Sequence, residues 1–263
     1  MPDPAAVHRK PRVVVVLPAY NAARTLQRTI DDIPPGIADE IVLVDDGSRD
    51  DTVAVARSLG LRVVVHPANR GYGGNQKTCY RTALEMGADI VVMLHPDYQY
   101  DPTVVPELVA PIASGKADAV FASRVMQGGA LEGRMPPWKY KTNLLLTALA
   151  NVVLDVYLTE YHSGFRAYSR KVLETCRLEA NSDNFIFDTE IIVQCAAQRF
   201  RIHEVPIHAR YFPEASTIPF TAACRYGLGI LWTLCKYRLH RAGWARFAMF
   251  EPQGAPPAPP VAR

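Results

Sequence analysis

The sequence has little that could hold a disulfide framework or a structural zinc ion. Its cysteines are odd in number, and no two of them form a C-x-x-C pair; the five are Cys79, Cys176, Cys195, Cys224 and Cys235. Disulfide-stapled domains and zinc sites normally show paired, closely spaced cysteines. Both classes are therefore not expected, and a reducing compartment such as the cytoplasm fits the chain.

Long hydrophobic runs are also absent. The longest apolar-rich stretches without a charge, residues 142–154 and 226–235, contain 13 and 10 residues, whereas a bilayer span needs about 18 or more. The first twelve residues are polar, and no secretory signal follows them. We expect no transmembrane helix.

Charge of one sign is scarce overall, since the net charge is only +3. So small a surplus argues against nucleic acid as the partner. The positive charge is nevertheless concentrated between residues 225 and 246, which contain no acidic residue and five basic ones: Arg225, Lys236, Arg238, Arg241 and Arg246. On a helix, Arg225 and Lys236 would lie about 20° apart, with Trp232 between them. Such a helix could lie at a membrane surface, or it could be a core helix with a solvated basic rim.

Between residues 12 and 124, short apolar runs alternate with helical patterns. Strands are predicted at residues 13–17, 41–44, 61–65, 90–94 and 119–122. Continuous rather than alternating Val, Ile and Leu is typical of a parallel sheet covered on both faces. We therefore predict a doubly wound α/β fold, with ligands at the carboxyl ends of the strands. Asn21 is predicted to cap the first helix, and Asp50 or Asp51 the second, which Gly60 ends.

After Arg124 the alternation stops. A loop rich in Gly and Pro at residues 127–137 precedes predicted helices at 138–158, 187–198 and 221–240, with a short strand at 201–208. The predicted organisation is a flexible segment at 1–11, one domain at 12–240, and a proline-rich disordered tail at 241–263. Within the domain, residues 12–124 would form a nucleotide-binding half and 125–240 an acceptor half.

Two polar motifs follow predicted strands. Asp45-Asp46-Gly47-Ser48 places two carboxylates where they could accept hydrogen bonds from a base or ribose, although Asp46 or Ser48 could equally cap the next helix. The glycine-rich loop at residues 69–75 could bring backbone close to a phosphate. It lacks the G-K-[ST] ending of a Walker loop, so a glycine-rich start to the next helix is the simpler interpretation.

The fourth predicted strand leads directly into His95-Pro96-Asp97-Tyr98-Gln99. Alternate residues of an extended segment point the same way, so His95, Asp97 and Gln99 could converge on a divalent ion. Asp97 would supply the hard oxygen ligand that Mg²⁺ or Mn²⁺ prefers. The alternative is an ordinary polar strand end.

Because these motifs occur together and in order, the sequence resembles glycosyltransferase family 2 on the GT-A fold over about residues 12–239. It is most similar to the dolichol- or polyprenol-phosphate sugar synthases, whose later motifs match residues 163–166, 187–190 and 204–207. The resemblance implies metal-dependent, inverting transfer of a sugar from a UDP- or GDP-linked donor to a polyprenyl or dolichyl phosphate. The enzyme would lie peripherally on the inner face of the membrane. A soluble transferase for small-molecule or natural-product acceptors, and a non-catalytic nucleotide-sugar or membrane-binding module, are the alternatives.

The resemblance also implies roles for individual residues. The base and ribose would be held by Pro18, Tyr20, Asp45 and Asp46, with Asn69 and Gly71 nearby. Asp97 would hold Mg²⁺ or Mn²⁺ on the diphosphate, and Arg124 and Arg166 would clamp the acceptor phosphate. Glu160, Asp188 or Glu190 would act as a base only for a hydroxyl acceptor, since a phosphate acceptor is already an anion.

Three positions depart from the family's pattern. His95 stands where the metal motif normally begins with Asp, which makes the local charge less negative. Ala22 replaces the acidic residue usual after the Tyr-Asn pair. In the segment 213–217, Thr217 stands where the synthases have a basic residue, which leaves Arg210 as a substitute.

Overall fold

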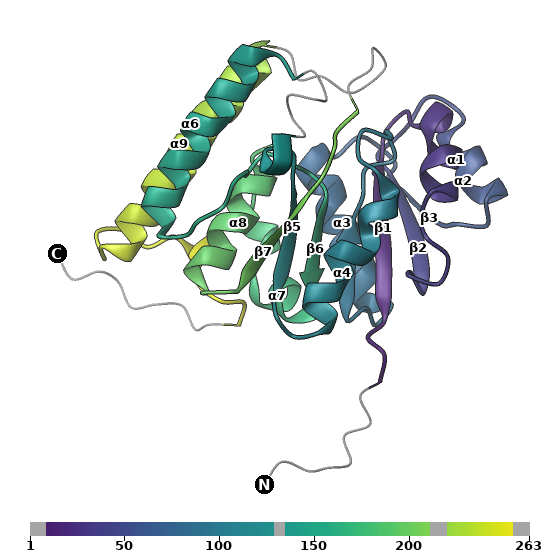
Figure 1. Cartoon of the computed structure of the whole chain (residues 1–263), viewed down its shortest axis with the longest axis horizontal. Helices are drawn as coiled ribbons and strands as arrows, with labels where there is room; N and C mark the ends of the chain where they lie inside the picture. Colours follow the sequence, from purple (N-terminus) through teal and green to yellow (C-terminus); the bar gives the residue numbers. More distant parts are fainter. Residues whose placement is uncertain (1–8, 129–134, 211–219, 255–263) are drawn as a thin grey trace, which may run out of the picture.

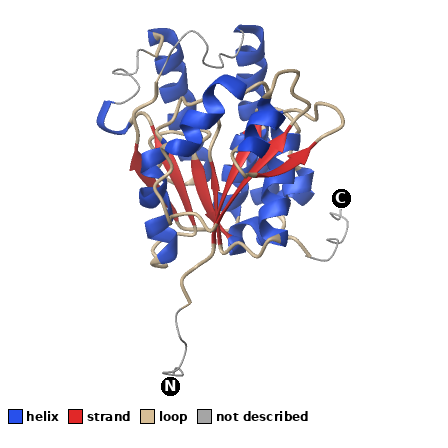
Figure 2. Cartoon of the chain, turned by 90° about the vertical axis from the view of Figure 1, so that its right-hand side faces the viewer, coloured by secondary structure: helices blue, strands red, loops and turns tan. Residues whose placement is uncertain are grey.

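The computed structural model describes residues 9–128, 135–210 and 220–254, which form a seven-stranded sheet with helices on both faces (Figures 1 and 2). The strands are β1 Val13–Ala19, β2 Glu40–Asp45, β3 Arg62–Val65, β4 Ile90–Met93, β5 Ala119–Ser123, β6 Arg166–Ser169 and β7 Ile202–Pro206. Their order is β3-β2-β1-β4-β6-β5-β7, and all neighbours are parallel except the two pairs made by β6. The predicted mainly parallel α/β fold is confirmed.

The helices are α1 Ala23–Asp31, α2 Thr52–Ser58, α3 Tyr72–Glu85, α4 Val105–Ala113, α6 Pro137–Leu154, α7 Arg170–Thr175, α8 Phe187–Ala197 and α9 Phe220–Arg241. All six predicted strands, including the short one at 201–208, begin and end within two residues of an observed strand. Strand β6 was not predicted, because its four residues include an arginine and a serine and have no apolar run.

Both faces of the sheet are buried, which explains the continuous valines of β1. Val13, Val15 and Leu17 belong to the core layer under α1, α2 and α4. Val14 and Val16 belong to the opposite layer, which α3 and α8 help to cover. Successive strand residues point to opposite faces, so a strand buried on both sides needs apolar residues at every position.

The first helix begins differently from the prediction, whereas the second begins as expected. Asn21 has a left-handed φ of 53° and its Oδ1 accepts from the Arg49 amide, so it does not cap α1. Asp50 accepts from the amides of both Ala23 and Thr52 and thereby joins the starts of α1 and α2. Gly60 ends the second helical segment with a φ of 73°, as expected.

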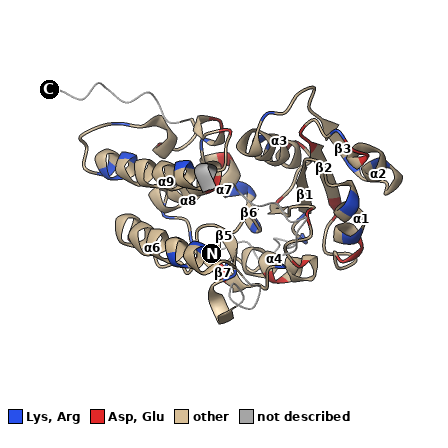
Figure 3. Ribbon diagram, turned by 90° about the horizontal axis from the view of Figure 1, so that it is seen from above, with Lys and Arg blue, Asp and Glu red and all other residues tan. Residues whose placement is uncertain are grey.

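Helices α6 and α9 lie side by side and extend away from the sheet (Figures 1 and 3). Helix α6 ends four residues before its predicted end, because Asp155 adopts a left-handed φ of 58°. Among the described helices, none is both long enough and apolar enough to span a bilayer.

The predicted disordered tail begins too early. Met249 and Phe250, in a short 3₁₀ helix at Ala248–Phe250, are buried in the core. The Gln198 side chain donates through Nε2 to the Phe250 carbonyl, and the Gln253 backbone amide donates to the Thr175 carbonyl. Residues 242–254 are therefore part of the folded domain, because two large apolar side chains anchor them. Residues 1–8 and 255–263, which complete the predicted terminal segments, lie outside the described residues, as do 129–134 and the motif at 213–217.

Candidate active site

The ends of β1 and β2 bring Pro18, Tyr20 and Asp45 to one edge of the sheet, where Ala19 pairs with Asp45. Tyr20 is half exposed. Asp45 is buried: its Oδ2 accepts from the amides of Gly47 and Ser48, whereas its Oδ1 has no hydrogen-bond partner within the described part of the chain. A buried oxygen without a partner is costly unless a ligand satisfies it. Contact of Pro18, Tyr20 and Asp45 with a nucleotide stays a prediction, and the unpartnered oxygen favours it.

The neighbouring carboxylate, Asp46, is bonded inside the protein. Its Oδ1 accepts from the Arg70 amide at 2.8 Å and lies 2.7 Å from His66 Nδ1, while its Oδ2 accepts from Gly71 at 3.0 Å. The Asn69 side chain donates to the Asp46 carbonyl. We therefore correct the predicted ribose contact: Asp46, Asn69 and Gly71 shape the loop before α3.

The glycines of this loop allow it to pack closely against the backbone of another segment, which explains them without a phosphate. Gly71 has a φ of 84°, and a Cβ there would lie 2.5 Å from the Asp183 carbonyl oxygen. A Cβ on Gly73 would collide with the Ser182 carbonyl, and the Gly73 amide donates to Asp183 at 2.9 Å. The simpler interpretation of the glycine-rich loop, as the start of a helix, is the one that fits.

The segment from His95 to Gln99 is a turn, so the predicted alternation of ligands along an extended loop is wrong. Tyr98 has a φ of 59°, and the Gln99 amide donates to Asp97 Oδ1 at 3.0 Å. The Tyr98 ring lies between the guanidinium groups of Arg28 and Arg210, at 4.1 and 4.3 Å from its centroid. The turn holds Asp97, and a ligand role for Gln99 stays a prediction.

A two-ligand metal site remains compatible with this turn. In the described residues no group of three His, Cys, Asp or Glu side chains could hold a metal. Asp97 Oδ2 and His95 Nδ1, however, make no hydrogen bond to any described residue. Burial lowers the pKa of His95, which favours the neutral imidazole that a metal requires. A divalent ion at a phosphate site commonly takes one or two protein carboxylates and completes its shell with phosphates and water. Asp97 fits such an ion, and the His95 nitrogen on the same turn suits Mn²⁺ better than Mg²⁺.

His95 is held in place by Tyr72, at the start of α3. The two rings stack with centroids 5.4 Å apart, and the Tyr72 hydroxyl lies 3.2 Å from His95 Nε2. The same hydroxyl donates to Asp188 Oδ2 at 2.7 Å, and Gln76 donates to Asp188 Oδ1 at 3.0 Å. Burial and the charge of Asp188 raise the pKa of Tyr72, so its proton is retained. Neither Tyr72 nor Gln76 was predicted, although both stand in the first turns of a helix that begins at the sheet edge.

Arg166 and Asp188 form part of the framework. The Arg166 side chain is fully buried and donates to the carbonyls of Ser163, Asp188 and Tyr161 at 2.7, 2.8 and 3.0 Å. Its guanidinium is also 3.7 Å from the Asp188 carboxylate. With these donors engaged, Arg166 is not placed to clamp an acceptor phosphate. Asp188 already accepts two hydrogen bonds and is likewise not a free base, so both predictions are corrected.

The Glu190 carboxylate is also hydrogen-bonded inside the protein. Its carboxylate accepts from the Ser182 amide and hydroxyl at 2.6 and 3.1 Å, and it lies 3.7 Å from Lys236 Nζ. The predicted base role is therefore corrected. The helical spacing predicts that Lys236 shares an exposed face with Arg225. Lys236 is instead mostly buried and faces the Glu190 carboxylate, so this prediction is wrong.

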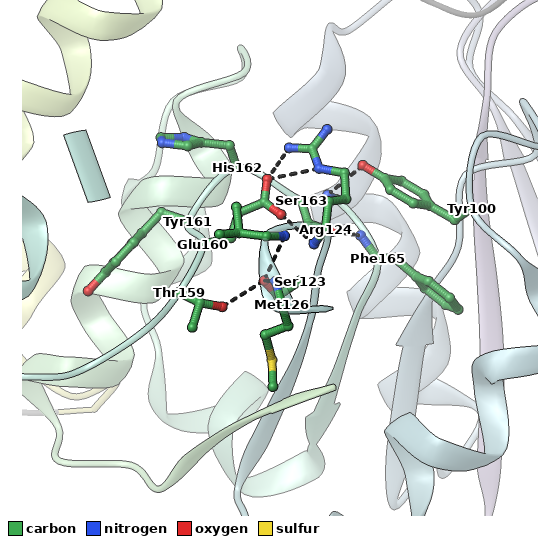
Figure 4. Close-up of polar contacts among 12 residues, drawn as sticks. Tyr100, Ser123, Arg124, Met126, Thr159, Glu160, Tyr161, His162, Ser163 and Phe165 are labelled. Carbon is green, nitrogen blue, oxygen red and sulfur yellow. Dashed lines mark hydrogen bonds and ion pairs between the residues drawn. The ribbon is translucent and has the colours of Figure 1, made fainter. Parts of the chain in front are cut away.

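A buried ion pair between Arg124 and Glu160 occupies the other side of the site (Figure 4). The Arg124 Nε donates to Glu160 Oε1 at 2.8 Å, Nη2 donates to the same oxygen, and the Arg124 amide donates to Oε2 at 2.7 Å. Burial would raise the pKa of Glu160, but Arg124 outweighs it and the pKa is lowered. An ionised carboxylate with these bonds is not a free base, which corrects that prediction for Glu160. A role of Arg124 at the acceptor phosphate stays a prediction.

Two further residues complete this side. Glu204, on β7, accepts from the amide and hydroxyl of Thr159 and from the Glu160 amide at 2.7, 2.9 and 3.2 Å. These three hydrogen bonds give the glutamate of the motif at residues 204–207 a structural role. Lys139, in the first turn of α6, has its pKa lowered by burial and by Arg124, so the start of α6 reaches the Arg124–Glu160 pair.

Comparison with known proteins identifies the family. The model of glycosyl transferase family 2 matches residues 14–177, more than half of the chain. A polyprenol monophosphomannose synthase of Mycolicibacterium smegmatis is 31% identical over 78% of this chain and 80% of its own length. A UDP-N-acetylglucosamine–dolichyl-phosphate N-acetylglucosaminyltransferase of Methanococcus voltae is 26% identical over 76% and 86%.

The fold is also that of solved GT-A enzymes. Glucosyl-3-phosphoglycerate synthase from Mycobacterium tuberculosis, solved with Mn²⁺, UDP-glucose and phosphoglyceric acid, superposes with a TM-score of 0.67 at 23% identity. The match covers 87% of this chain and 80% of that one. The same enzyme has been solved with Mg²⁺ and UDP. The protein is thus a glycosyltransferase of the GT-A fold that belongs to glycosyl transferase family 2, where it is most similar to the polyprenol-phosphate sugar synthases.

Proposed function

We propose that the protein transfers a sugar from a UDP- or GDP-linked donor to polyprenyl phosphate, with inversion and with a divalent metal. The observation that supports this most directly is the division of charge across the site. On the side proposed for the donor, Asp45 and Asp97 each have a carboxylate oxygen with no hydrogen-bond partner among the described residues. Arg124 and Lys139 lie on the side proposed for the acceptor. The relatives named for dolichyl-phosphate and polyprenol products favour the same acceptor.

The chemistry needs little from a base. A phosphate acceptor is already an anion, so its oxygen can attack the anomeric carbon directly and displace the nucleoside diphosphate. This agrees with a site in which Glu160, Asp188 and Glu190 are all engaged in hydrogen bonds. Asp97 and His95 would hold the metal, which when bound offsets charge on the departing diphosphate. Arg124 and Lys139 would orient the acceptor phosphate.

The same proposal includes a membrane-facing surface on α6 and α9. Trp138, Leu145 and Val152 follow one another at intervals of seven on α6 and are 52%, 72% and 78% exposed. On α9, Leu228 and Trp232 are 68% and 58% exposed. Side chains at these spacings share one helical face. Large exposed apolar surfaces on a folded domain mark interaction sites.

The charges on these helices favour an anionic bilayer as the partner. Neither helix contains an acidic residue, the two lysines of α6 lie near its N-terminal end, and the basic residues of α9 lie toward both of its ends. Arg225, Arg238 and Arg241 are exposed. A second copy of the chain would bring like charges together, whereas anionic lipids attract them with about 1 kcal/mol for each basic residue near the surface. The enzyme would therefore dock peripherally on the inner face of the membrane.

Vesicle binding checks this surface. Val152→Asp is expected to weaken binding to vesicles containing phosphatidylglycerol at least about tenfold, because an exposed apolar contact is replaced by a like charge to the lipid. Flotation or sedimentation measures it, and Val65→Asp is the matched control, since Val65 is a half-exposed valine on the distant β3. Equal binding of both variants would contradict the surface. A dimer of the unaltered protein that Val152→Asp separates would show that a second copy covers it instead.

The reaction itself is tested with labelled UDP- and GDP-sugars and polyprenyl phosphate. The expected product extracts into organic solvent and is lost when a chelator removes the metal. Transfer to a soluble acceptor that needs neither lipid nor detergent would support the soluble transferase instead. Metal-independent binding of UDP and GDP without turnover would support a binding module.

A further inference from the structure

The Tyr72 hydroxyl joins His95 to a buried carboxylate. It donates to Asp188 Oδ2 at 2.7 Å and lies 3.2 Å from His95 Nε2. A tyrosine hydroxyl has one proton, and Asp188 accepts it. The hydroxyl oxygen is then left to accept a hydrogen bond, so His95 must carry its own proton on Nε2.

Asp188 is held so that it keeps accepting from Tyr72. Its other oxygen accepts from Gln76 at 3.0 Å, and its backbone carbonyl accepts from the buried Arg166 guanidinium at 2.8 Å. The carboxylate is itself buried. Partners on every side fix its orientation, so the direction of the Tyr72 hydroxyl is fixed as well.

The His95 ring is also fixed in position. A Cβ on Gly164 would lie only 2.7 Å from His95 Nε2, so the glycine leaves room for this edge of the ring. Tyr72 stacks on the ring with an angle of 12° between the planes. Nδ1, at the other edge, has no hydrogen-bond partner among the described residues. Its lone pair is available on the same turn as Asp97.

We infer that Tyr72 is a positioning residue that fixes the Nε2-protonated form of His95 and thereby presents Nδ1 as a nitrogen ligand to the metal beside Asp97. The inference rests on the proposed function, because the ion is the one that would bind with the nucleoside diphosphate. Metal-ligating histidines generally owe their tautomer to a hydrogen bond from the second ring nitrogen. Mg²⁺ prefers oxygen ligands, whereas transition metals accept imidazole. The site is therefore biased toward Mn²⁺ over Mg²⁺.

The tautomer can be measured without any metal. In long-range ¹H–¹⁵N correlation spectra above pH 8, His95 of the unaltered protein should show a protonated Nε2 and an unprotonated Nδ1. Tyr72→Phe keeps the stacked ring and should give a mixture of tautomers. Tyr161→Phe is the matched control, because it removes a buried tyrosine hydroxyl that donates to Asn151 at 2.8 Å rather than to His95. A His95 protonated on Nδ1 in the unaltered protein would overturn the inference.

Metal binding gives the second measurement. With Mn²⁺ and UDP or GDP, electron spin echo spectra should show a directly coordinated ¹⁴N that disappears in His95→Asp. Tyr72→Phe should weaken Mn²⁺ binding by about 10- to 100-fold, the range found when such supporting partners are removed. His95→Asp should shift the preference toward Mg²⁺, and Tyr161→Phe should leave Mn²⁺ affinity unchanged.

The outcomes separate this inference from the proposed function. Tight Mn²⁺ binding without a nitrogen signature, or binding that Tyr72→Phe does not weaken, would overturn the inference and leave the metal-dependent transferase standing. No Mn²⁺ binding with either nucleotide would overturn the metal part of the proposed function, and the inference with it. A product formed without metal would do the same.

Discussion

Replacing Asp97 with alanine is expected to abolish sugar transfer while leaving the fold intact. Asp97 is the one carboxylate of the His95–Gln99 turn, and its Oδ2 has no partner among the described residues. If it holds the proposed metal, its loss removes several kcal/mol of stabilisation from the departing diphosphate. About 4 kcal/mol corresponds to roughly a thousandfold lower kcat.

The effect on stability should be small, because Asp97 is only half buried and accepts one backbone hydrogen bond. The loss of such a bond costs about 1 kcal/mol. Asp101→Ala is the matched control: this carboxylate lies on the same loop, accepts from the Thr103 amide and pairs with Arg210. Turnover assays and thermal unfolding of both variants measure the two effects. An Asp97→Ala protein that keeps more than a tenth of the activity would contradict the metal assignment.

Much of the sheet was predictable from the sequence, because a parallel strand buried on both faces needs apolar residues at consecutive positions. The run from Val13 to Leu17 follows this pattern and lies in β1. Strand β6 was not predictable in the same way. Its residues Arg166 and Ser169 are polar, and its place between β4 and β5 depends on antiparallel pairing with strands that precede it by dozens of residues.

The location of the site was also predictable, since the carboxyl ends of parallel strands meet at one edge. The roles of individual side chains were not. Asp45 and Asp46 are adjacent in sequence, yet one has an unpartnered oxygen and the other is bonded to a loop 24 and 25 residues later. Arg166 fits the expected motif, but its guanidinium donates its hydrogen bonds to backbone carbonyls inside the protein. Whether a charged group is free depends on contacts between distant segments, which local patterns do not encode.

Glu160→Leu is expected to destabilise the protein by about 3–5 kcal/mol, the usual cost of removing one partner of a buried ion pair. Both side chains of the Arg124–Glu160 pair are more than nine-tenths buried, and the Arg124 amide also donates to Glu160. Without the carboxylate, a guanidinium would remain in a low-dielectric environment with its main counter-charge gone. Chemical denaturation measures the loss in free energy of unfolding.

The double variant Arg124→Met/Glu160→Leu distinguishes the structural role of this pair from its proposed functional one. Because apolar residues can replace a buried ion pair at little cost, it should regain most of the stability lost in Glu160→Leu. Its KM for polyprenyl phosphate should nevertheless rise, since Arg124 is gone from the acceptor side. The exposed pair of Arg170 and Glu174 supplies the control, because Glu174→Leu should change stability by less than about 1 kcal/mol. A double variant with normal KM would restrict Arg124 to the framework and leave Lys139 as the residue that orients the acceptor phosphate.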